Sequence, residues 1–302
     1  MNNYFELNIS INPEMEEIVS DIFFTNFDCE GVVLEEETYK DLEMTSTTRG
    51  TLRVFLTSCP SNIQEILFTE RELLKSRGLT DEELGSWKIT LDEKKNQDWS
   101  KKWKEKWTVT HVTDKIAVVP SWLSYEPKDG EIIITLDPGC AFGTGTHQTT
   151  QLCMKALEKY LKKGDSMADI GTGSGILAIL AKKMGAEKVY GCDNDETVID
   201  VAKENAGVNG AGVNGVNILF ELNTADKITE QYDFVCANIL HFVLAEIMGD
   251  LKKITKPNGL ISLSGILDEK KDMVLVAIDR EHLKIIDTLT QDQWISYVVQ
   301  KV

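Results

Sequence analysis

Three glycines, an acid and an apolar strand stand together in "ADIGTGSGILAIL", residues 168–180. The glycines are Gly171, Gly173 and Gly175, in the pattern G-x-G-x-G, which differs from the G-x-G-x-x-G of dinucleotide-binding loops. Asp169 precedes them at the end of a predicted strand. Glycine lets the backbone approach a ligand closely, and a carboxylate here repels a diphosphate but attracts a cation. The stretch therefore predicts a site for a sulfonium cofactor with a free amino group.

A second acid follows the next predicted strand, in "VYGCDND". Asp193 ends that strand, where a carboxylate can accept hydrogen bonds from both hydroxyls of a ribose. Nicotinamide-dependent enzymes carry an acid at the same place, so Asp193 indicates a nucleoside without choosing between cofactors. We expect the neighbouring Asp195 to cap the next helix.

The asparagine in "YDFVCANILHF" discriminates between cofactor chemistries. Asn238 directly follows an apolar strand, and methyltransferases that act on amine nitrogens use Asn or Asp here to hold the nitrogen towards the methyl group. The following residues, "ILH", lack the prolines and aromatic ring found where the substrate is a flat amide or base. This favours a flexible amine as the acceptor. The alternative is that Asn238 only forms a turn.

Another glycine-rich stretch, "LDPGCAFGTGTHQTTQLC", occupies residues 136–153. It looks like a phosphate loop, but nothing in it requires a phosphate. We expect it to act as a lid and helix cap beside the main glycine loop, with His147 capping or packing at the helix start.

Composition places the chain among ordinary globular proteins, with 302 residues, 42% hydrophobic and 27% charged. A net charge of −17 argues against direct nucleic-acid binding and would suit a basic partner. The sequence begins without a signal-peptide pattern and has no membrane-spanning run, so we expect a cytoplasmic protein without membrane contact. The six cysteines form no C-x-x-C pair, which favours structural thiols and no metal site.

The order of hydrophobic periodicities predicts two domains. Residues 1–92 read as β-α-β-β-α-β, typical of a small α+β ferredoxin-like domain. Residues 93–107 read as a helical linker, with Trp99, Trp103 and Trp107 on one face. Residues 108–302 alternate apolar strands with amphipathic helices, which predicts an α/β, doubly wound parallel sheet. The last two strands are joined by about two residues, so the final strand must run antiparallel.

These motifs together resemble the PrmA family, on the strings "DPGCAFGTGTHQTT", "DIGTGSG", "GCDND" and "ANIL". The resemblance runs from about residue 96 to the end. It implies a Rossmann-like, seven-stranded class I methyltransferase domain that uses S-adenosylmethionine. It also implies methylation of lysine side chains and the α-amino group of the eleventh protein of the large ribosomal subunit, with the front domain recognising that substrate.

Site residues follow from the same resemblance. It implies that Thr150, Gly171, Asp193 and Asn238 contact the cofactor, with Asn238 also catalytic, and that Phe142 lies near the methionine end. Two positions depart from the family pattern, because Gln148 stands where proline is frequent and His241 where alanine is frequent. His241 could alter the substrate mouth.

Other functions stay open from the sequence. A methyltransferase of this fold could act on another amine or amide nitrogen, such as protein glutamine or a small molecule. A nicotinamide-dependent dehydrogenase is opposed by Asp169 and by the antiparallel final strand. A non-catalytic ribosome-assembly factor with this fold would not need Asn238.

Overall fold

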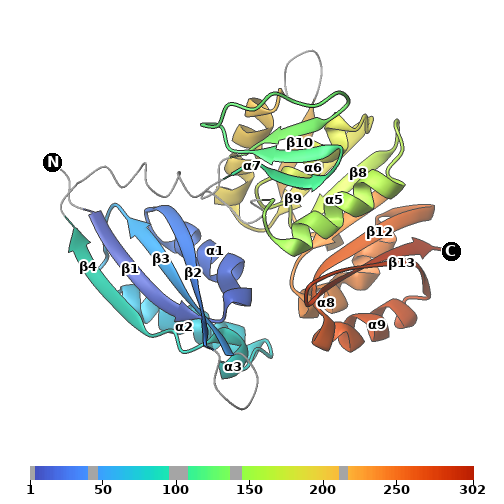
Figure 1. The fold of residues 1–302 in the computed structure, drawn as a ribbon. Coiled ribbons are helices and arrows are strands. Elements are labelled where there is room, and N and C mark those ends of the chain that lie inside the picture. Colours follow the sequence, from blue (N-terminus) through green and yellow to red (C-terminus); the bar gives the residue numbers. More distant parts are fainter. Residues whose placement is uncertain (1–3, 40–46, 95–107, 137–144, 211–216) are drawn as a thin grey trace. The chain divides into compact units, whose positions relative to one another are not determined.

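The structure is a computed structural model that describes residues 4–39, 47–94, 108–136, 145–210 and 217–302 (Figure 1). The chain forms two compact units, with the division between Thr108 and Val109. Each unit is described by itself. No helix within the described ranges is long and apolar enough to cross a membrane.

The first unit contains a four-stranded sheet in the order β2-β3-β1-β4. Every neighbouring pair in it is antiparallel. Its core lies between the sheet and the helices, with residues such as Leu7, Phe23, Val54 and Leu67 fully buried. The elements are β1 (Tyr4–Ile11), η1 (Pro13–Met15), α1 (Glu16–Asn26), β2 (Cys29–Tyr39), β3 (Thr47–Leu56), α2 (Ile63–Ser76), α3 (Asp81–Leu84) and β4 (Ile89–Lys94).

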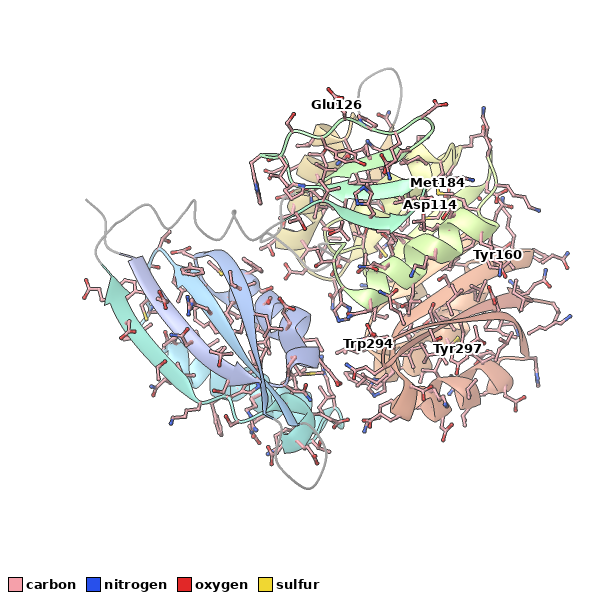
Figure 2. All side chains as sticks on the ribbon, in the orientation of Figure 1. Asp114, Glu126, Tyr160, Met184, Trp294 and Tyr297 are labelled. Carbon is pink, nitrogen blue, oxygen red and sulfur yellow. The ribbon has the colours of Figure 1, made fainter. Side chains whose placement is uncertain are left out.

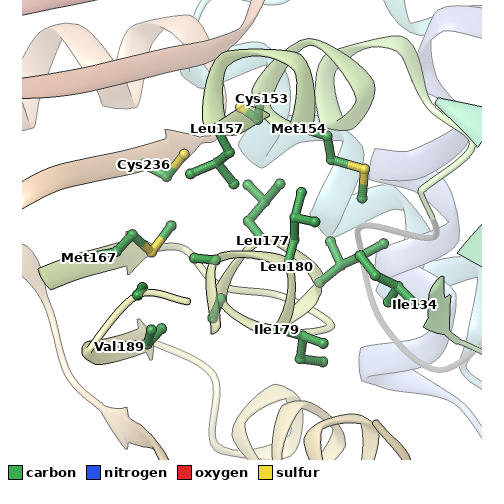
Figure 3. Packing of buried hydrophobic residues seen from close by; sticks show 14 of the residues in the cluster. Ile134, Cys153, Met154, Leu157, Met167, Leu177, Ile179, Leu180, Val189 and Cys236 are labelled. Atoms are coloured by element: carbon green, nitrogen blue, oxygen red, sulfur yellow. The ribbon is translucent and has the colours of Figure 1, made fainter. Parts of the chain in front are cut away.

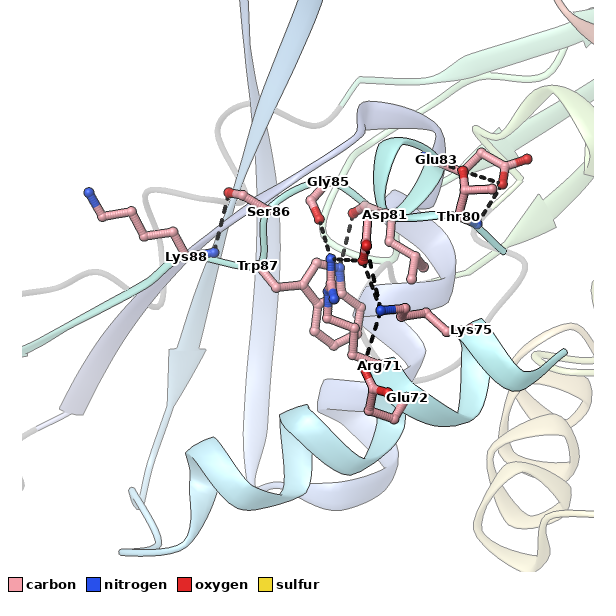
Figure 4. A network of polar contacts seen from close by, with 11 residues as sticks. Arg71, Glu72, Lys75, Thr80, Asp81, Glu83, Gly85, Ser86, Trp87 and Lys88 are labelled. Carbon is pink, nitrogen blue, oxygen red and sulfur yellow. Dashed lines mark hydrogen bonds and ion pairs between the residues drawn. The ribbon is translucent and has the colours of Figure 1, made fainter. Parts of the chain in front are cut away.

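The sequence did not predict the one-turn helix α3, which is held by polar contacts (Figure 4). The Arg71 guanidinium contacts the Asp81 carboxylate at 2.9 Å and donates to the Gly85 carbonyl at 3.0 Å. Thr80 and Glu83 form a reciprocal capping box at its start. These contacts fix a turn too short to show a helical period.

The second unit contains a seven-stranded sheet in the order β10-β9-β8-β11-β12-β14-β13. Five strands run parallel, and β14 is antiparallel to both β12 and β13. This confirms the doubly wound sheet with an antiparallel closing hairpin. The strands are β8 (Ser166–Ile170), β9 (Lys188–Asp193), β10 (Ile218–Leu222), β11 (Tyr232–Asn238), β12 (Thr255–Leu267), β13 (Leu283–Gln291) and β14 (Trp294–Lys301).

Helices cover the two faces of this sheet. One hydrophobic cluster joins α5 (Gln148–Tyr160), α6 (Ile176–Lys183) and α7 (Glu196–Val208) to the sheet, with Met167, Val189 and Cys236 among its members (Figure 3). A small sheet of β5 (Thr110–Thr113), β6 (Ile116–Val119) and β7 (Ile132–Thr135) packs into the same cluster. A second cluster joins α8 (His241–Lys253) and α9 (Lys271–Arg280) to the sheet. The 3-10 turns η3 (Ala225–Lys227) and η4 (Asp268–Lys270) complete the unit.

Two side chains of the closing strand β14, Trp294 and Tyr297, belong to different hydrophobic clusters; both are labelled in Figure 2. Trp294 is buried beside Leu152 of α5, and its ring lies 4.9 Å from the His147 ring, centroid to centroid. Tyr297 belongs to the cluster with α8 and α9. The antiparallel strand therefore packs against α5, which carries Thr150.

A polar clamp ties together the amino ends of three strands. The Asp233 carboxylate of β11 accepts hydrogen bonds from the Ser166 hydroxyl of β8 at 2.6 Å and from Lys256 Nζ of β12 at 2.7 Å. Burial alone would raise the pKa of Asp233, but Lys256 and Ser166 outweigh it and lower the pKa to about 2. The ionised carboxylate thus stabilises the sheet at the edge away from the glycine loop.

We expect Asp233→Asn to lower the free energy of unfolding by about 1 kcal/mol at pH 7. The value is small because both side chains of the Asp233–Lys256 ion pair are partly exposed to solvent. Because the folded-state pKa is depressed, this stabilisation is present above the unfolded pKa of about 3.9 and is lost as pH falls towards 2. Urea unfolding of both proteins at pH 7, 4 and 3 measures it. A difference between the proteins that stayed constant with pH would contradict the assignment.

Candidate functional site

A buried carboxylate lies at the carboxyl end of the central strand β8. Asp169 is 1% exposed, and its Oδ2 accepts a hydrogen bond from the Thr172 hydroxyl at 2.8 Å. Its Oδ1 is buried and has no hydrogen-bond partner within the part of the chain that the structure describes. Burial raises the pKa of this carboxyl to about 7, while the Thr172 hydroxyl opposes the rise. An unpartnered buried acceptor is costly, so Oδ1 marks a place for a donor supplied by a ligand.

The glycine loop turns directly after Asp169. Gly171, Gly173 and Gly175 have φ values of 70°, 52° and 81°, in the left-handed region that favours glycine. A Cβ on Gly171 would lie 2.5 Å from Ile239 Cγ2, so a side chain there has no room. The amides of Gly171 and Thr172 both donate to the Cys192 carbonyl at 2.9 Å, which binds the turn to β9.

Asp193, at the end of β9, also holds this loop. Its Oδ2 accepts from the Gly173 amide at 3.1 Å, and its Oδ1 accepts from the Asn194 amide at 2.8 Å. Burial raises the pKa of Asp193, and these backbone donors oppose the rise. The Asp195 amide also donates to Oδ1, at 3.3 Å, so Oδ2 is the oxygen that keeps a further lone pair for a ligand hydroxyl. Asp195 caps α7 by accepting from the Thr197 amide at 2.8 Å, which confirms that prediction.

Asn238 is the last residue of β11 and is 6% exposed. Its Nδ2 donates to the Thr150 hydroxyl of α5 at 3.2 Å, which fixes the orientation of the amide. Its Oδ1 is buried, and no described residue forms a hydrogen bond with it. Cys236 pairs with Asp169 across β11 and β8, and Asn238 lies two residues further along, so Asn238 and Asp169 face the same side of the sheet. The two unpartnered oxygens therefore lie at the ends of neighbouring strands, on one face.

A bulge in β12 supports the end of β11 that carries Asn238. The Ile239 amide donates to the Ser264 carbonyl at 3.2 Å, and the Ser264 hydroxyl donates to the Thr149 carbonyl at 3.0 Å. The register of β12 against β14 shifts between Leu263 and Ile266 at this point. The bulge thus links the end of β11 to the first turn of α5.

Comparisons with known proteins decide the family. The profile described as "Ribosomal protein L11 methyltransferase (PrmA)" matches residues 3–302. The chain belongs to this family. A ribosomal protein L11 methyltransferase from Caldicellulosiruptor saccharolyticus is 34% identical over 312 residues, covering 99% of both chains. One from Clostridium botulinum (strain Eklund 17B / Type B) is 37% identical over 233 residues, covering 77% of this chain and 74% of the relative.

A solved structure agrees with the family assignment. The crystal structure of a ribosomal protein L11 methylase from Lactobacillus delbrueckii subsp. bulgaricus aligns with a TM-score of 0.60 at 32% identity. The alignment covers 65% of this chain and 99% of that one. The class I methyltransferase fold expected from the sequence is therefore confirmed, as is the resemblance to the PrmA family.

The residues that the family resemblance singled out come together at one edge of the sheet. Thr150, Gly171, Asp193 and Asn238 lie on α5, the glycine loop, β9 and β11, whose ends meet beside Asp169. Their contacts with a cofactor stay a prediction. Phe142 and the linker tryptophans lie outside the described residues.

The two histidines noted in the sequence both lie at helix starts. His147 is the N-cap of α5 and accepts from the Thr149 amide at 3.3 Å, which confirms its capping role. Burial lowers the pKa of His147 to about 4, so it is a weak base. His241 is the first residue of α8 and is 6% exposed, with its ring against Phe242. Its effect on the substrate mouth stays a prediction.

Sequence reasoning missed two residues that shape the site, Thr172 and Gly191. Gly191 pairs with Asp169 across β9 and β8. A Cβ on Gly191 would lie 2.9 Å from Thr172 Oγ1 and 2.6 Å from the Phe220 ring, so only glycine leaves space for the Thr172 hydroxyl. The sequence held one signal for Thr172. It is a hydroxyl residue within the glycine motif, three residues after the acid at the end of the strand.

The side chains at this edge fit S-adenosylmethionine. Among the described residues, the Asp169 Oδ1 and Asn238 Oδ1 atoms are buried acceptors without a hydrogen-bond partner. A ligand with an ammonium group and ribose hydroxyls matches this set of acceptors. Within the described ranges, no group of His, Cys, Asp or Glu could hold a metal ion.

Proposed function

We propose that this chain transfers methyl groups from S-adenosylmethionine to lysine side chains and the N-terminal amine of ribosomal protein L11. Family membership over residues 3–302 supports the reaction and the substrate protein. The observation that carries the chemistry is the buried, unpartnered Asn238 Oδ1 at the carboxyl edge of the sheet. A carbonyl oxygen can accept a hydrogen bond from the N–H of an amine acceptor.

Each site residue receives a role in this proposal. Thr150 orients the Asn238 amide, Gly171 allows the backbone to approach the methionine part, and Asp193 accepts from the ribose hydroxyls. Asn238 contacts the cofactor and holds the acceptor nitrogen. When bound, S-adenosylmethionine supplies an electrophilic methyl group on a sulfonium.

Positioning accounts for most of the rate in such a transfer. Asn238 Oδ1 holds an amine N–H and so directs the nitrogen lone pair towards the methyl carbon, at a reacting distance of roughly 3–3.5 Å. A lysine ammonium with a pKa of about 10.4 must first lose a proton. Burial around Asn238 disfavours the charged amine, so the proton leaves to water as the side chain enters.

The first unit has the features of a substrate-recognition domain. Its β-α-β-β-α-β order and antiparallel order β2-β3-β1-β4 support a ferredoxin-like module, which would comprise residues 1–92, followed by a linker over 93–107 and the methyltransferase domain over 108–302. The net charge of −17 favours a basic protein partner. The same charge predicts no direct nucleic-acid binding, and we place the reaction in the cytoplasm with its ribosomal substrate.

Labelled S-adenosylmethionine and a mixture of purified ribosomal proteins test this function. We expect the label on L11, and after acid hydrolysis we expect it to remain as methylated lysine and a methylated N-terminal residue. A methylated glutamine amide would instead release methylamine on hydrolysis, and that result would replace the proposed acceptor with an amide. Label on a different protein would contradict the proposed substrate.

A further inference from the structure

Two buried serines of β12 face α5 at the level of the site. Ser264 pairs with Asn238 across β12 and β11, and paired residues face the same side of a sheet. The Ser264 hydroxyl donates to the Thr149 carbonyl, in the first turn of α5, at 3.0 Å. Two residues earlier, the Ser262 hydroxyl lies 3.9 Å from the Cys153 sulfur, one turn further along α5. The strand beside Asn238 therefore holds the start of α5 through polar contacts as well as packing.

Three hydrogen bonds close a ring that includes the Asn238 side chain. Asn238 Nδ2 donates to the Thr150 hydroxyl at 3.2 Å, and Thr150 follows Thr149 in the chain. The Ser264 hydroxyl binds the Thr149 carbonyl, and the Ser264 carbonyl accepts from the Ile239 amide at 3.2 Å. Because Ile239 follows Asn238, the ring returns to its starting point. Moving one member of such a ring strains the other hydrogen bonds in it.

The backbone and the side chain of Asn238 are held by different elements. The backbone end is fixed at Ile239, since a Cβ on Gly171 would lie 2.5 Å from Ile239 Cγ2 and a Cβ on Gly265 would lie 2.3 Å from the Ile239 carbonyl oxygen. The side-chain amide depends instead on α5. The Ser264 hydroxyl joins these two supports directly, so it sets where the first turn of α5 stands relative to the end of β11.

We propose that Ser264 is a positioning residue for methyl transfer. Its hydroxyl holds the first turn of α5 so that Thr150 directs the Asn238 oxygen towards the acceptor amine. This inference rests on the proposed function, because it takes Asn238 Oδ1 as the group that holds the amine. Ser264 acts through Thr150 and Asn238 and needs no contact of its own with the substrate.

Ser264→Ala is expected to lower kcat for methylation of ribosomal protein L11 about tenfold, because the amide that holds the reacting nitrogen loses its alignment. KM for L11 should change by less than about twofold, since the contacts that bind the substrate protein stay in place. Initial rates at varied L11 concentration, with saturating S-adenosylmethionine, measure both constants.

Thr255→Val is the matched control for Ser264→Ala. Thr255 is also fully buried, and its hydroxyl donates to the Leu251 carbonyl at 2.7 Å, at the other end of β12. Each variant thus removes one buried hydroxyl that donates to a backbone carbonyl. We expect similar losses of unfolding free energy in urea, with a wild-type kcat in Thr255→Val.

A double-mutant cycle shows whether Ser264 acts through Asn238. In the Asn238→Ala background, Ser264→Ala should change kcat by less than about twofold, because the amide that Ser264 positions is absent. The side-chain amide signals of Asn238 in the proton–nitrogen NMR spectrum of the ligand-free protein give a readout that does not depend on activity. These signals should shift in Ser264→Ala and stay in place in Thr255→Val.

A wild-type kcat in Ser264→Ala, or unshifted Asn238 signals, would overturn the inference. A second tenfold loss in the Asn238→Ala background would also overturn it, because that result indicates general structural support. If Ser264→Ala does not fold, Ser264→Cys takes its place, since a thiol is only a weak donor. Its kcat should fall by a smaller factor, and an unchanged kcat would overturn the proposal. Wild-type enzyme that did not methylate L11 would instead contradict the proposed function.

Discussion

Replacing Asn238 with alanine is expected to slow methyl transfer to ribosomal protein L11 by about 100-fold or more, because the acceptor nitrogen loses its positioning partner. The change removes a buried oxygen that has no hydrogen-bond partner among the described residues, together with the hydrogen bond to Thr150. Initial rates with saturating S-adenosylmethionine and L11 measure the effect. Since the loss is in positioning, we expect kcat to fall much more than KM for L11 rises.

Three variants separate this role from general damage. Asn26→Ala removes an exposed asparagine at the end of α1, whose Nδ2 donates to the Ile22 carbonyl of the same helix, and should leave the rate unchanged. Thr150→Ser keeps the hydroxyl that orients Asn238 and should retain most activity, whereas Thr150→Val should lose part of it. An Asn238→Ala enzyme with wild-type kcat would show that this amide has no part in the reaction.

Gly265→Ala is expected to destabilise the protein by roughly 3 kcal/mol, from left-handed strain together with steric overlap. Gly265 lies in the β12 bulge with φ of 86°, and a Cβ there would meet the Ile239 carbonyl oxygen at 2.3 Å. That contact is with backbone, so no side-chain rotation relieves it. Because Ile239 follows Asn238, the strain acts directly on the strand end that carries the site.

Gly164→Ala is the matched control for this substitution. Gly164 also has a positive φ, of 91°, but a Cβ there would have no atom within 4 Å. Gly164→Ala should lower the free energy of unfolding only by the strain of a left-handed backbone, about 1 kcal/mol. Urea unfolding of both variants measures the difference. Equal losses of unfolding free energy in the two variants would show that the protein adjusts to avoid the contact between the new Cβ and the Ile239 carbonyl oxygen.

The sequence predicted the parts of the site that depend on strand ends. Asp169, Asp193 and Asn238 each terminate or closely follow an apolar run, and the carboxyl ends of parallel strands share one edge of a sheet. Their meeting there follows from the doubly wound pattern alone. The short link between the last two strands likewise predicted the antiparallel closure, because two residues cannot make a parallel crossover.

Other parts depend on register between strands, which the sequence does not show. Gly191 matters because it pairs with Asp169 and clears a space for Thr172. Gly265 matters because a bulge in β12 brings it against Ile239. In the sequence both glycines appear as ordinary interruptions of apolar strands. Only the pairing of the strands shows which neighbouring atoms each glycine makes room for.

The central claim is that this chain methylates ribosomal protein L11 through the Asn238 site. The most direct test is the intact mass of purified L11 after incubation with the purified enzyme and S-adenosylmethionine. We expect the mass to rise in whole methyl increments with wild-type enzyme and to stay almost unchanged with Asn238→Ala over the same time. An unmodified L11 mass, from wild-type enzyme that binds S-adenosylmethionine, would contradict the account.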